Sequence, residues 1–181
     1  LALERLPAGP CRVLDLGTGS GAVALALPAQ RPDAAIDAIE ASPAAAAVAR
    51  DNARRLGLGN VEVLGGDWFG PVAGRRYAVI VGNPPYLAAD DPHLPALAHE
   101  PRAALVAGPT GLEALAAIAA AAPAYLDPGG WLLLEHGADQ GAAVRGLLRA
   151  AGLGAVASCR DLAGLERVSL GRGGAAGAAS G

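Results

Sequence analysis

A glycine-rich segment near the start of the chain has the spacing of a ligand-binding turn. Asp15–Gly21 reads DLGTGSG and follows an apolar run that is expected to be a buried strand. Glycines at alternate positions let the backbone turn tightly and approach a ligand with no Cβ in the way. Glu40 follows about twenty residues later, at the end of the next expected strand, where a carboxylate can accept both ribose hydroxyls of a nucleoside. Together the two features predict a nucleoside site; the alternative is a plain strand-to-helix turn in some other α/β domain.

The spacing of the glycines and the charge beside them indicate which nucleoside is bound. Dinucleotide sites usually have the pattern G-x-G-x-x-G, with a helix N-terminus directed at a pyrophosphate. Here the pattern is G-x-G-x-G and Asp15 precedes it, so the local charge opposes a pyrophosphate and favours an ammonium group. S-adenosylmethionine, which combines adenosine with an amino-acid tail and a sulfonium, is a cationic ligand of that kind.

Asp67 is the expected acceptor for the adenine amino group of such a ligand, because it follows the third expected strand. The alternative interpretation is a solvated aspartate in the turn after Gly65 and Gly66. No metal ligands are predicted. The residues predicted to bind the cofactor are Asp15, Gly17, Thr18, Gly19, Gly21, Glu40, Asp67, Trp68 and Asn83.

A second group, Asn83-Pro84-Pro85-Tyr86, ends the fourth expected strand. In an open parallel sheet the ligand crevice lies outside the carboxyl ends of the strands, so this group is expected to face the nucleoside site. Two prolines hold Asn83 extended and remove two N–H donors, which leaves the Asn83 side-chain oxygen and the Pro84 carbonyl as acceptors. Such a rim can grip a planar NH2 group by its two hydrogens, with the Tyr86 ring stacked behind it. The predicted catalytic residues are Asn83, Pro84 and Tyr86, and Pro85 completes the predicted substrate-binding set.

Together the two groups resemble the class I S-adenosylmethionine-dependent methyltransferases that modify planar amino groups. Within that class the chain resembles the bacterial peptide chain release factor N5-glutamine methyltransferase family, from about Val13 to Arg172. The further motifs that carry this resemblance are Glu100-Pro101-Arg102 with Ala104-Leu105, Gly111-Leu112, Pro128-Gly129-Gly130, Leu134-Glu135-His136-Gly137, and Asp161-Leu162-Ala163-Gly164 with Arg167.

The resemblance implies an α/β, Rossmann-like fold with a seven-stranded, mostly parallel sheet and helices on both faces. It also implies methyl transfer from S-adenosylmethionine to the side-chain amide nitrogen of the glutamine in the Gly-Gly-Gln motif of peptide chain release factors. The family usually has aspartate where this chain has Glu40, and glutamate there is expected to do the same ribose work. The family also has a small helical N-terminal domain, missing here, that is expected to help dock the release factor.

Three other interpretations stay open on the sequence. A ribosomal-protein glutamine methyltransferase would share every catalytic residue and differ only in its docking surface. An adenine-N6 nucleic-acid methyltransferase would share Asn83–Tyr86, but it should carry a basic groove or a target-recognition domain, and neither is evident. A non-catalytic nucleoside-binding module is disfavoured by the intact rim of acceptors.

The elements that must position these residues follow from the hydrophobic pattern. Short apolar runs alternate with Ala-rich helical stretches, which predicts βαβ units and a parallel sheet. Ser42-Pro43 predicts a helix N-cap, Thr110–Glu113 predicts a capping box, and Leu87–Gly108 is expected to be a long functional loop without periodicity. The expected strands are 12–16, 34–39, 60–64, 77–81, 131–135, 155–158 and 167–170, and the expected helices are 21–29, 43–56, 110–125 and 141–151, with a turn at 128–130.

Composition excludes several classes of protein. The 181 residues are 52% hydrophobic and 17% charged, which excludes disorder over most of the chain. A net charge of −3 disfavours direct, specific binding to nucleic acid. Two cysteines and three histidines exclude a disulfide framework and the usual zinc site. The apolar runs are too short to cross a bilayer and no signal peptide is evident, so we expect a cytoplasmic monomer with one domain, 1–172, and a disordered Gly/Ala-rich tail, 173–181.

Overall fold

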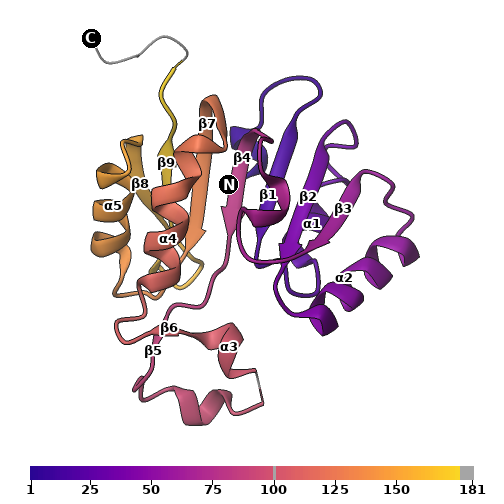
Figure 1. Ribbon diagram of the computed structural model, residues 1–181. Helices are drawn as coiled ribbons and strands as arrows, with labels where there is room; N and C mark the ends of the chain where they lie inside the picture. Colours follow the sequence, from indigo (N-terminus) through magenta and orange to yellow (C-terminus); the bar gives the residue numbers. More distant parts are fainter. Residues whose placement is uncertain (100, 176–181) are drawn as a thin grey trace.

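Seven strands form one sheet in the order β3-β2-β1-β4-β7-β9-β8 (Figure 1). The computed structural model describes residues 1–99 and 101–175. The first five strands in this order are parallel, and β9 runs antiparallel to both of its neighbours. This confirms the predicted seven-stranded, mostly parallel sheet. The strands are β1 (Arg12–Leu16), β2 (Ala35–Glu40), β3 (Val61–Gly65), β4 (Tyr77–Gly82), β7 (Leu126–Glu135), β8 (Gly154–Arg160) and β9 (Glu166–Arg172).

Helices cover both faces of the sheet, as predicted. In Figure 1, α4 and α5 lie in front of the sheet, and α1 lies behind it. The predicted N-cap of α2 is confirmed, because the Ser42 hydroxyl oxygen accepts the Ala45 N–H at 3.3 Å and Pro43 is the first helical residue. The longer helices are α1 (Ala22–Ala26), α2 (Pro43–Arg55), α4 (Glu113–Ala121) and α5 (Gly141–Ala150), and short 3-10 helices span Leu3–Arg5, Gly70–Val72, Leu94–Leu97 and Ala122–Ala124.

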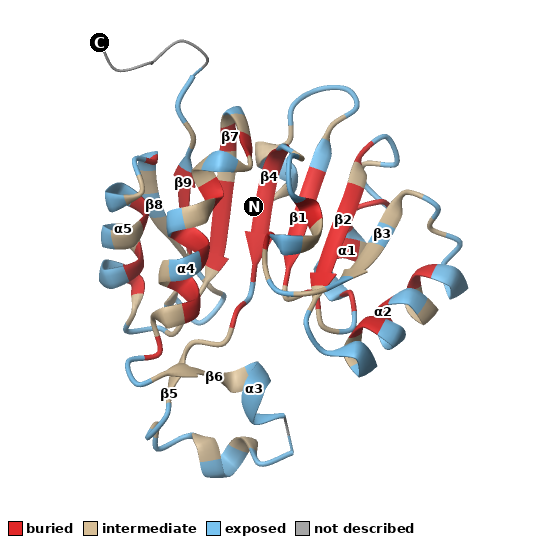
Figure 2. Cartoon of the chain, viewed as in Figure 1, coloured by how far each residue is buried: buried red, intermediate tan, exposed pale blue. Residues whose placement is uncertain are grey.

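Two hydrophobic cores sandwich the sheet, and Figure 2 shows the central strands buried between them. Because neighbouring residues of a strand point to opposite faces, Val13 belongs to one core and Leu14 to the other. The core that contains Leu14 packs against α4 and α5 through Leu115, Ile118, Val144 and Leu148. The core that contains Val13 packs against α1 through Ala24. Burial on both faces explains why these strands read as continuous apolar runs.

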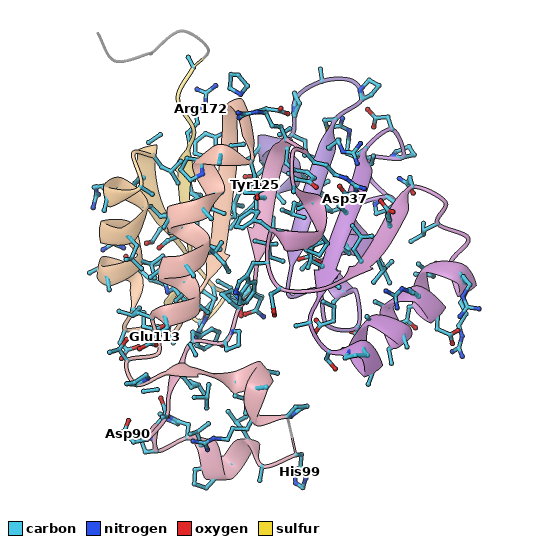
Figure 3. The ribbon with its side chains drawn as sticks, viewed as in Figure 1. Asp37, Asp90, His99, Glu113, Tyr125 and Arg172 are labelled. Atoms are coloured by element: carbon cyan, nitrogen blue, oxygen red, sulfur yellow. The ribbon has the colours of Figure 1, made fainter. Side chains whose placement is uncertain are left out.

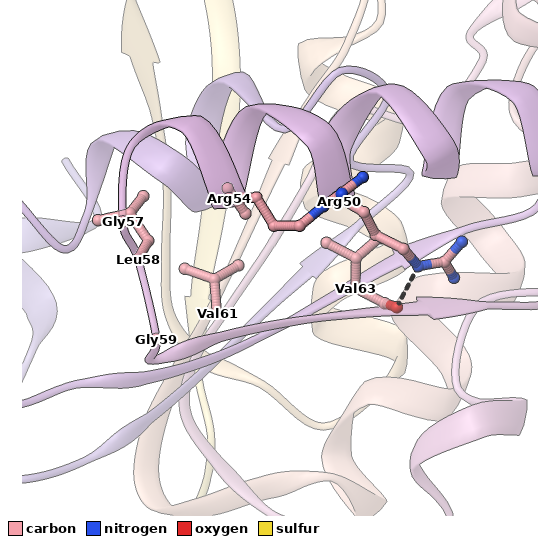
Figure 4. Close-up of a pocket in the computed structure, with 8 residues that line it drawn as sticks. Arg50, Arg54, Gly57, Leu58, Gly59, Val61 and Val63 are labelled. Carbon is pink, nitrogen blue, oxygen red and sulfur yellow. Dashed lines mark hydrogen bonds between the residues drawn. The ribbon is translucent and has the colours of Figure 1, made fainter.

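Strand β3 is one of the two edge strands of the sheet, and its outer backbone groups would otherwise be open to pairing with another chain. Arg50 of α2 reaches across this edge, and its Nε donates to the Val63 carbonyl at 3.1 Å (Figure 4). A shallow hollow lies here between α2 and β3. None of the predicted site residues lines it, so this hollow is separate from the predicted site.

The predicted loop 87–108 contains short elements that its sequence did not reveal. They are β5 (Leu87–Ala88), β6 (Val106–Gly108), the 3-10 helix Leu94–Leu97 and α3 (Arg102–Leu105). β5 and β6 pair in parallel, and the segment lies beyond the carboxyl ends of the main strands (Figure 1). Elements of two to four residues are too short for a periodic pattern, which is why the prediction of an irregular loop was wrong. We call residues 87–99 and 101–108 the insertion; Glu100 lies outside the described residues.

Strand β7 begins at Leu126, five residues before its predicted start at Trp131. The predicted turn at 128–130 is therefore wrong, because these residues belong to the strand. Gly129 has a φ of +75°, and the register between β4 and β7 shifts between Tyr77 and Val79. A Cβ on Gly130 would lie 2.9 Å from the carbonyl oxygens of Tyr77 and Ala78. The glycines thus let an irregular strand continue where their composition suggested a break.

Helix α4 begins at Glu113, later than the capping box predicted, and Thr110 is not its N-cap residue. Gly111 has a φ of +76°, which a helix cannot include. Half of the box still forms, because the Glu113 carboxylate accepts the Thr110 N–H at 2.9 Å. The helix ends at Ala121, ahead of the expected 125, and Pro123 then lies in a 3-10 turn.

The C-terminal segment is described only in part. Gly173 donates its N–H to the Gly130 carbonyl at 2.8 Å, and the Gly174 carbonyl accepts from Gly129 at 2.9 Å. Residues 176–181 lie outside the described residues, so disorder of the tail stays a prediction. In the part of the chain that the structure describes, no helix has the length and apolar character needed to cross a membrane.

A buried carboxylate ties three strands together at the amino-terminal end of the sheet. Asp37 is 2% exposed and accepts hydrogen bonds from the Tyr77 hydroxyl at 2.6 Å, from Arg75 at 3.0 Å and from Arg12 at 3.1 Å. Burial disfavours its charge, but the hydrogen bonds from Tyr77, Arg75 and Arg12 outweigh burial and hold the pKa of Asp37 below its usual value. Figure 3 shows Asp37 far from Asp90 and His99 of the insertion, which lies beyond the carboxyl ends of the strands.

Replacing Asp37 with alanine is expected to lower the free energy of unfolding by about 3 kcal/mol, because it leaves the buried Tyr77 hydroxyl and two partly exposed arginines without their acceptor. Because the folded pKa of Asp37 is lowered, its contribution is present above about pH 4 and is lost as the pH falls through that folded pKa. Urea unfolding checks both statements. The control Asp51→Ala removes only exposed ion pairs and should change stability by less than about 1 kcal/mol. Equal losses in the two variants would contradict the prediction.

Candidate active site

A cavity of about 480 Å³ opens at the carboxyl ends of β1, β2 and β4. Seven of the predicted site residues line it, namely Gly17, Gly19, Glu40, Asp67, Trp68, Asn83 and Pro85. Five others lie outside the lining, namely Asp15, Thr18, Gly21, Pro84 and Tyr86. The size suits a nucleoside-sized ligand, and the position is the switch point where the strand order reverses.

The glycine-rich segment is fastened to the neighbouring strand by its backbone. The N–H groups of Gly17 and Thr18 both donate to the Ile39 carbonyl at 2.9 Å. Gly17 and Gly19 have φ values of +70° and +58°, a conformation that residues with a Cβ rarely adopt. These hydrogen bonds therefore fix the position of the turn's backbone relative to the ends of β1 and β2, beside the cavity.

Glu40 lines the cavity at the end of β2, and both of its carboxylate oxygens hold backbone donors. Oε2 accepts the Gly19 N–H at 2.8 Å, and Oε1 accepts the Ser42 N–H at 2.8 Å. These bonds fix the orientation of the carboxylate between the glycine-rich turn and the start of α2. Each oxygen retains a further lone pair, so the group can still accept hydrogen bonds from a ligand.

Asp15 is buried beneath the turn and is 3% exposed. Its Oδ2 accepts the Thr18 hydroxyl at 2.6 Å and the Ala24 N–H at 3.1 Å, so it joins the glycine-rich turn to helix α1. Burial raises the pKa of Asp15 to about 6. The hydrogen bonds from Thr18 and Ala24 lower this pKa in part, and the negative charge of Glu40 raises it slightly. In this structure its contacts hold the turn in place from below.

Asp67 and Trp68 form the wall of the cavity after β3. The backbone leads into them through Gly66, whose N–H donates to the Glu40 carbonyl at 3.1 Å. Trp68 has a φ of +42°, and its ring edge lies 3.8 Å from where a Cβ on Gly17 would be. A non-glycine residue in the left-handed region costs conformational energy, of order 1 kcal/mol. This cost accompanies an indole that packs close to the glycine-rich turn at the wall of the cavity.

Two residues of Asn83–Tyr86, Asn83 and Pro85, line the same cavity. Asn83 is exposed and lines the cavity with Pro85, whereas Pro84 is buried. The Asn83 carbonyl lies 3.7 Å from the position of a Cβ on Gly17, so the two motifs meet closely. Tyr86 is half-buried and packs against the core on the α4 and α5 side. Its carbonyl oxygen accepts a hydrogen bond from Gln140 at 2.9 Å.

Several lining residues were not predicted from the sequence. Pro101, Ala103 and Ala104 come from the insertion and close one side of the cavity. The signal for them was the length of the segment and the motif at 100–105, but neither indicates which residues face a ligand. Ser42 and Ala45 of the α2 N-terminus also line the cavity. They follow directly from Glu40, because the chain turns there into the helix.

His136 and Glu135 were left without a role by the sequence analysis. His136 is fully buried, with Nδ1 at 2.8 Å from the Gly137 carbonyl and Nε2 at 2.8 Å from the Ser169 hydroxyl. These contacts join β7 to β9, and neither His136 nor Glu135 lines the cavity. Within 1–99 and 101–175, no cluster of three or more His, Cys, Asp or Glu side chains could hold a metal ion.

The strand order and the cavity at the switch point define a Rossmann-like, doubly wound domain. Residues 1–104 match the family model described as the Methyltransferase small domain, and the chain belongs to that family. Among curated proteins it is similar to the release factor glutamine methyltransferase of Yersinia pestis, with 53% identity over 173 residues. That alignment covers 94% of this chain and 62% of the relative, so the chain spans less than two thirds of the relative's length.

Solved structures share the fold at low sequence identity. A methyltransferase from Pyrococcus furiosus has a TM-score of 0.70 and 20% identity, and the match covers 95% of this chain and 79% of that one. The 16S rRNA N2 G1207 methyltransferase of T. thermophilus, solved in complex with AdoMet and guanosine, has a TM-score of 0.66 and 23% identity, covering 91% of this chain and 38% of that one. Both matches place the chain in the Rossmann-like methyltransferase fold.

The buried carboxyl of Asp15 is expected to make stability fall as the pH rises from about 4 to about 6. Its folded pKa, about 6, lies above the ordinary value of about 3.9, so the folded chain binds this proton more tightly than the unfolded chain. An amide oxygen at the Oδ2 position can keep both hydrogen bonds. Asp15→Asn should therefore gain stability relative to the wild type over this pH range, as measured by urea unfolding at each pH.

Asp33→Asn is the matched control for this experiment. Asp33 is an exposed aspartate whose pKa is lowered by its hydrogen bond from Arg31, so its removal should change the pH dependence in the opposite direction. Parallel curves for Asp15→Asn and the wild type would show that the carboxyl of Asp15 does not titrate in this way.

Proposed function

We propose that this chain transfers a methyl group from S-adenosylmethionine to the side-chain amide nitrogen of the glutamine in the Gly-Gly-Gln motif of peptide chain release factors. The observation that carries the proposal is the arrangement of one cavity. Glu40 and Asp67, which we assign to the nucleoside, line it together with Asn83 and Pro85, which we assign to the amide. A cofactor and a planar amide could therefore meet in the same enclosure.

The residues on the nucleoside side fit the cofactor. Each oxygen of Glu40 holds one backbone N–H and has a lone pair left for a ribose hydroxyl. Asp67 can accept the adenine amino group, and Trp68 offers an aromatic wall beside it. The relative from T. thermophilus, which shares the fold, was solved with AdoMet bound. Bound there, S-adenosylmethionine would supply an electrophilic methyl group on its sulfonium.

Asn83 and Pro84 are assigned to the activation of the substrate amide nitrogen. An amide nitrogen is a poor nucleophile, because its lone pair is delocalised into the carbonyl. In the proposed mechanism the Asn83 side-chain oxygen and the Pro84 carbonyl accept the two N–H bonds of the substrate amide. As positive charge develops on that nitrogen these hydrogen bonds strengthen, which stabilises the transition state more than the ground state. The proton can leave afterwards without a dedicated base, because a protonated amide is strongly acidic.

The proposed substrate rests on relatives and on charge. The curated relative that the chain matches at 53% identity is named release factor glutamine methyltransferase. The net charge of −3 supports a protein substrate over a nucleic acid, which would favour a basic groove. A ribosomal-protein glutamine would fit the same acceptors, so the substrates have to be compared directly.

We also propose that the protein acts in the cytoplasm as a monomer. Both cysteines, Cys11 and Cys159, are free thiols, which suits a reducing compartment.

Glu40→Gln is expected to weaken S-adenosylmethionine binding by roughly tenfold to a hundredfold, because hydrogen bonds to a charged acceptor contribute about 1.5–3 kcal/mol. Calorimetry on the purified chain measures the dissociation constant. The control Glu62→Gln changes an exposed glutamate on β3 that pairs with Arg75, and it should leave affinity unchanged. If Glu40→Gln bound the cofactor as well as the wild type, the ribose assignment would be wrong.

Asn83→Ala is expected to abolish methyl transfer while S-adenosylmethionine affinity changes little, because the side chain is assigned to the substrate amide. The experiment offers release factor, ribosomal protein and adenine-containing DNA in parallel, with labelled cofactor. Wild-type chain should label the release factor at the Gly-Gly-Gln glutamine. Asn60→Ala, at the opposite end of the sheet, should retain the label.

Two outcomes would overturn this assignment. Labelling of DNA but not of release factor would favour an adenine methyltransferase. Loss of cofactor binding in Asn83→Ala would contradict the division of the cavity into a nucleoside side and an amide side.

A further inference from the structure

We propose that Gln140 is a positioning residue that sets the orientation of Asn83–Tyr86 for methyl transfer. This inference rests on the proposed function, because it concerns how the rim of acceptors is held. Gln140 follows β7 and is the N-cap residue of α5. It does not line the cavity, so any effect on catalysis must act through the segment that it contacts.

The side chain of Gln140 joins three loops at the carboxyl end of the sheet. Its Nε2 donates to the Tyr86 carbonyl at 2.9 Å and to the Gly111 carbonyl at 3.3 Å. Its Oε1 accepts the Gly137 N–H at 2.9 Å. The amide nitrogen of the side chain faces two carbonyls and the amide oxygen faces one N–H. Exchanging the positions of the nitrogen and the oxygen would lose all three hydrogen bonds, so only the observed orientation of the amide is allowed.

The composition of Asn83–Tyr86 makes such a donor necessary. Pro84 and Pro85 have no N–H, so these two residues cannot fasten their segment to a neighbouring strand by donating. Their carbonyls and that of Tyr86 need donors from elsewhere. Gln140 supplies one directly after the prolines, and the acceptors of Asn83 and Pro84 therefore lie between β4 on one side and this hydrogen bond on the other.

The backbone around the junction is packed too closely to accommodate a different arrangement. Gly111 is buried with a φ of +76°, and a Cβ there would lie 2.6 Å from the Tyr86 carbonyl oxygen and 3.1 Å from Gln140 Nε2. A Cβ on Gly137 would lie 3.1 Å from Gln140 Oε1. Glycine at both positions thus lets the two backbones approach the carboxamide.

The loop that carries Gln140 is itself held firmly. His136 donates its N–H to the Arg167 carbonyl at 3.0 Å, and the Arg167 side chain donates back to the His136 carbonyl at 3.2 Å. The Gln140 N–H donates to the Gly137 carbonyl at 3.0 Å and closes the turn. The motifs at 134–137 and 161–167, which line no part of the cavity, thereby act as the support from which Gln140 reaches Tyr86.

Gln140→Glu tests the inference with almost no change in shape. The new carboxylate can still accept the Gly137 N–H, but it cannot donate and it faces two carbonyl oxygens. We expect kcat for release factor methylation to fall by about a hundredfold, the loss expected when a reacting group shifts by about 1 Å. The dissociation constant for S-adenosylmethionine should stay within about twofold of the wild type, because Gln140 does not line the cavity.

The pH dependence of the fall in kcat distinguishes a positioning role of Gln140 from a general loss of folded structure in the variant. The two facing carbonyls favour the neutral acid, which can again donate to Tyr86. The ratio of the kcat of Gln140→Glu to the wild-type kcat should therefore rise as the pH is lowered from 8 to 6. Gln30→Glu makes the same chemical change at an exposed position in the turn between α1 and β2, and its ratio should stay near one at every pH.

Amide hydrogen exchange gives a second readout that needs no substrate. In Gln140→Glu, peptides covering residues 82–88 should exchange faster than in the wild type, whereas β1 and β2 should stay protected. Unchanged exchange at 82–88, or a full kcat in an active preparation, would overturn the inference about Gln140. Absence of methylation by the wild-type chain would instead count against the proposed function, and the exchange experiment would still decide the role of Gln140.

Discussion

The parallel pairing of β1 with both β2 and β4 is the constraint on which the rest of the structure depends. Leu16 is in register with Ile39 on one side and with Gly82 on the other, so three strands end at the same level. Parallel strands need crossovers, and here the connection after β1 passes through α1 on one face of the sheet whereas the connection after β4 passes through α4 on the other, which opens a crevice between β1 and β4. The residues that directly follow β1, β2 and β4 therefore line one cavity, although they are far apart in sequence.

Within that crevice, backbone groups do most of the positioning. The Ile39 carbonyl holds the glycine-rich turn, and the Glu40 carboxylate bridges this turn to α2. Each such hydrogen bond contributes only about 1 kcal/mol to stability, whereas a buried group left unpaired would cost more. Breaking one of these bonds is therefore unfavourable, and the turn keeps its position. Asn83–Tyr86 is the exception, because its prolines cannot donate. Its support comes from the side chain of Gln140, which contacts the Tyr86 carbonyl directly although it lies more than fifty residues away in sequence.

The two polar networks of the molecule serve different ends of the sheet. Asp37 with its arginines and Tyr77 closes the amino-terminal end, where it stabilises the pairing of β1, β2 and β4. His136, Arg167 and Gln140 organise the carboxyl end, where the proposed chemistry takes place. The second network lies where the general rule for open α/β sheets places ligands, outside the carboxyl ends of the strands.

The sequence by itself determined the α/β class with its mostly parallel sheet, the glycine-rich turn with Glu40, and the place of Asn83–Tyr86 directly after β4, because these depend on local patterns and on which residues end a strand. It failed where short-range signals misled, as at Pro128–Gly130, where the glycines continue an irregular strand. Only the tertiary structure decided that Asp15 lies beneath the turn, that Pro101 and Ala104 line the cavity, and that Gln140 contacts Tyr86. Those facts depend on contacts between segments distant along the chain, and no pattern within a single segment encodes them.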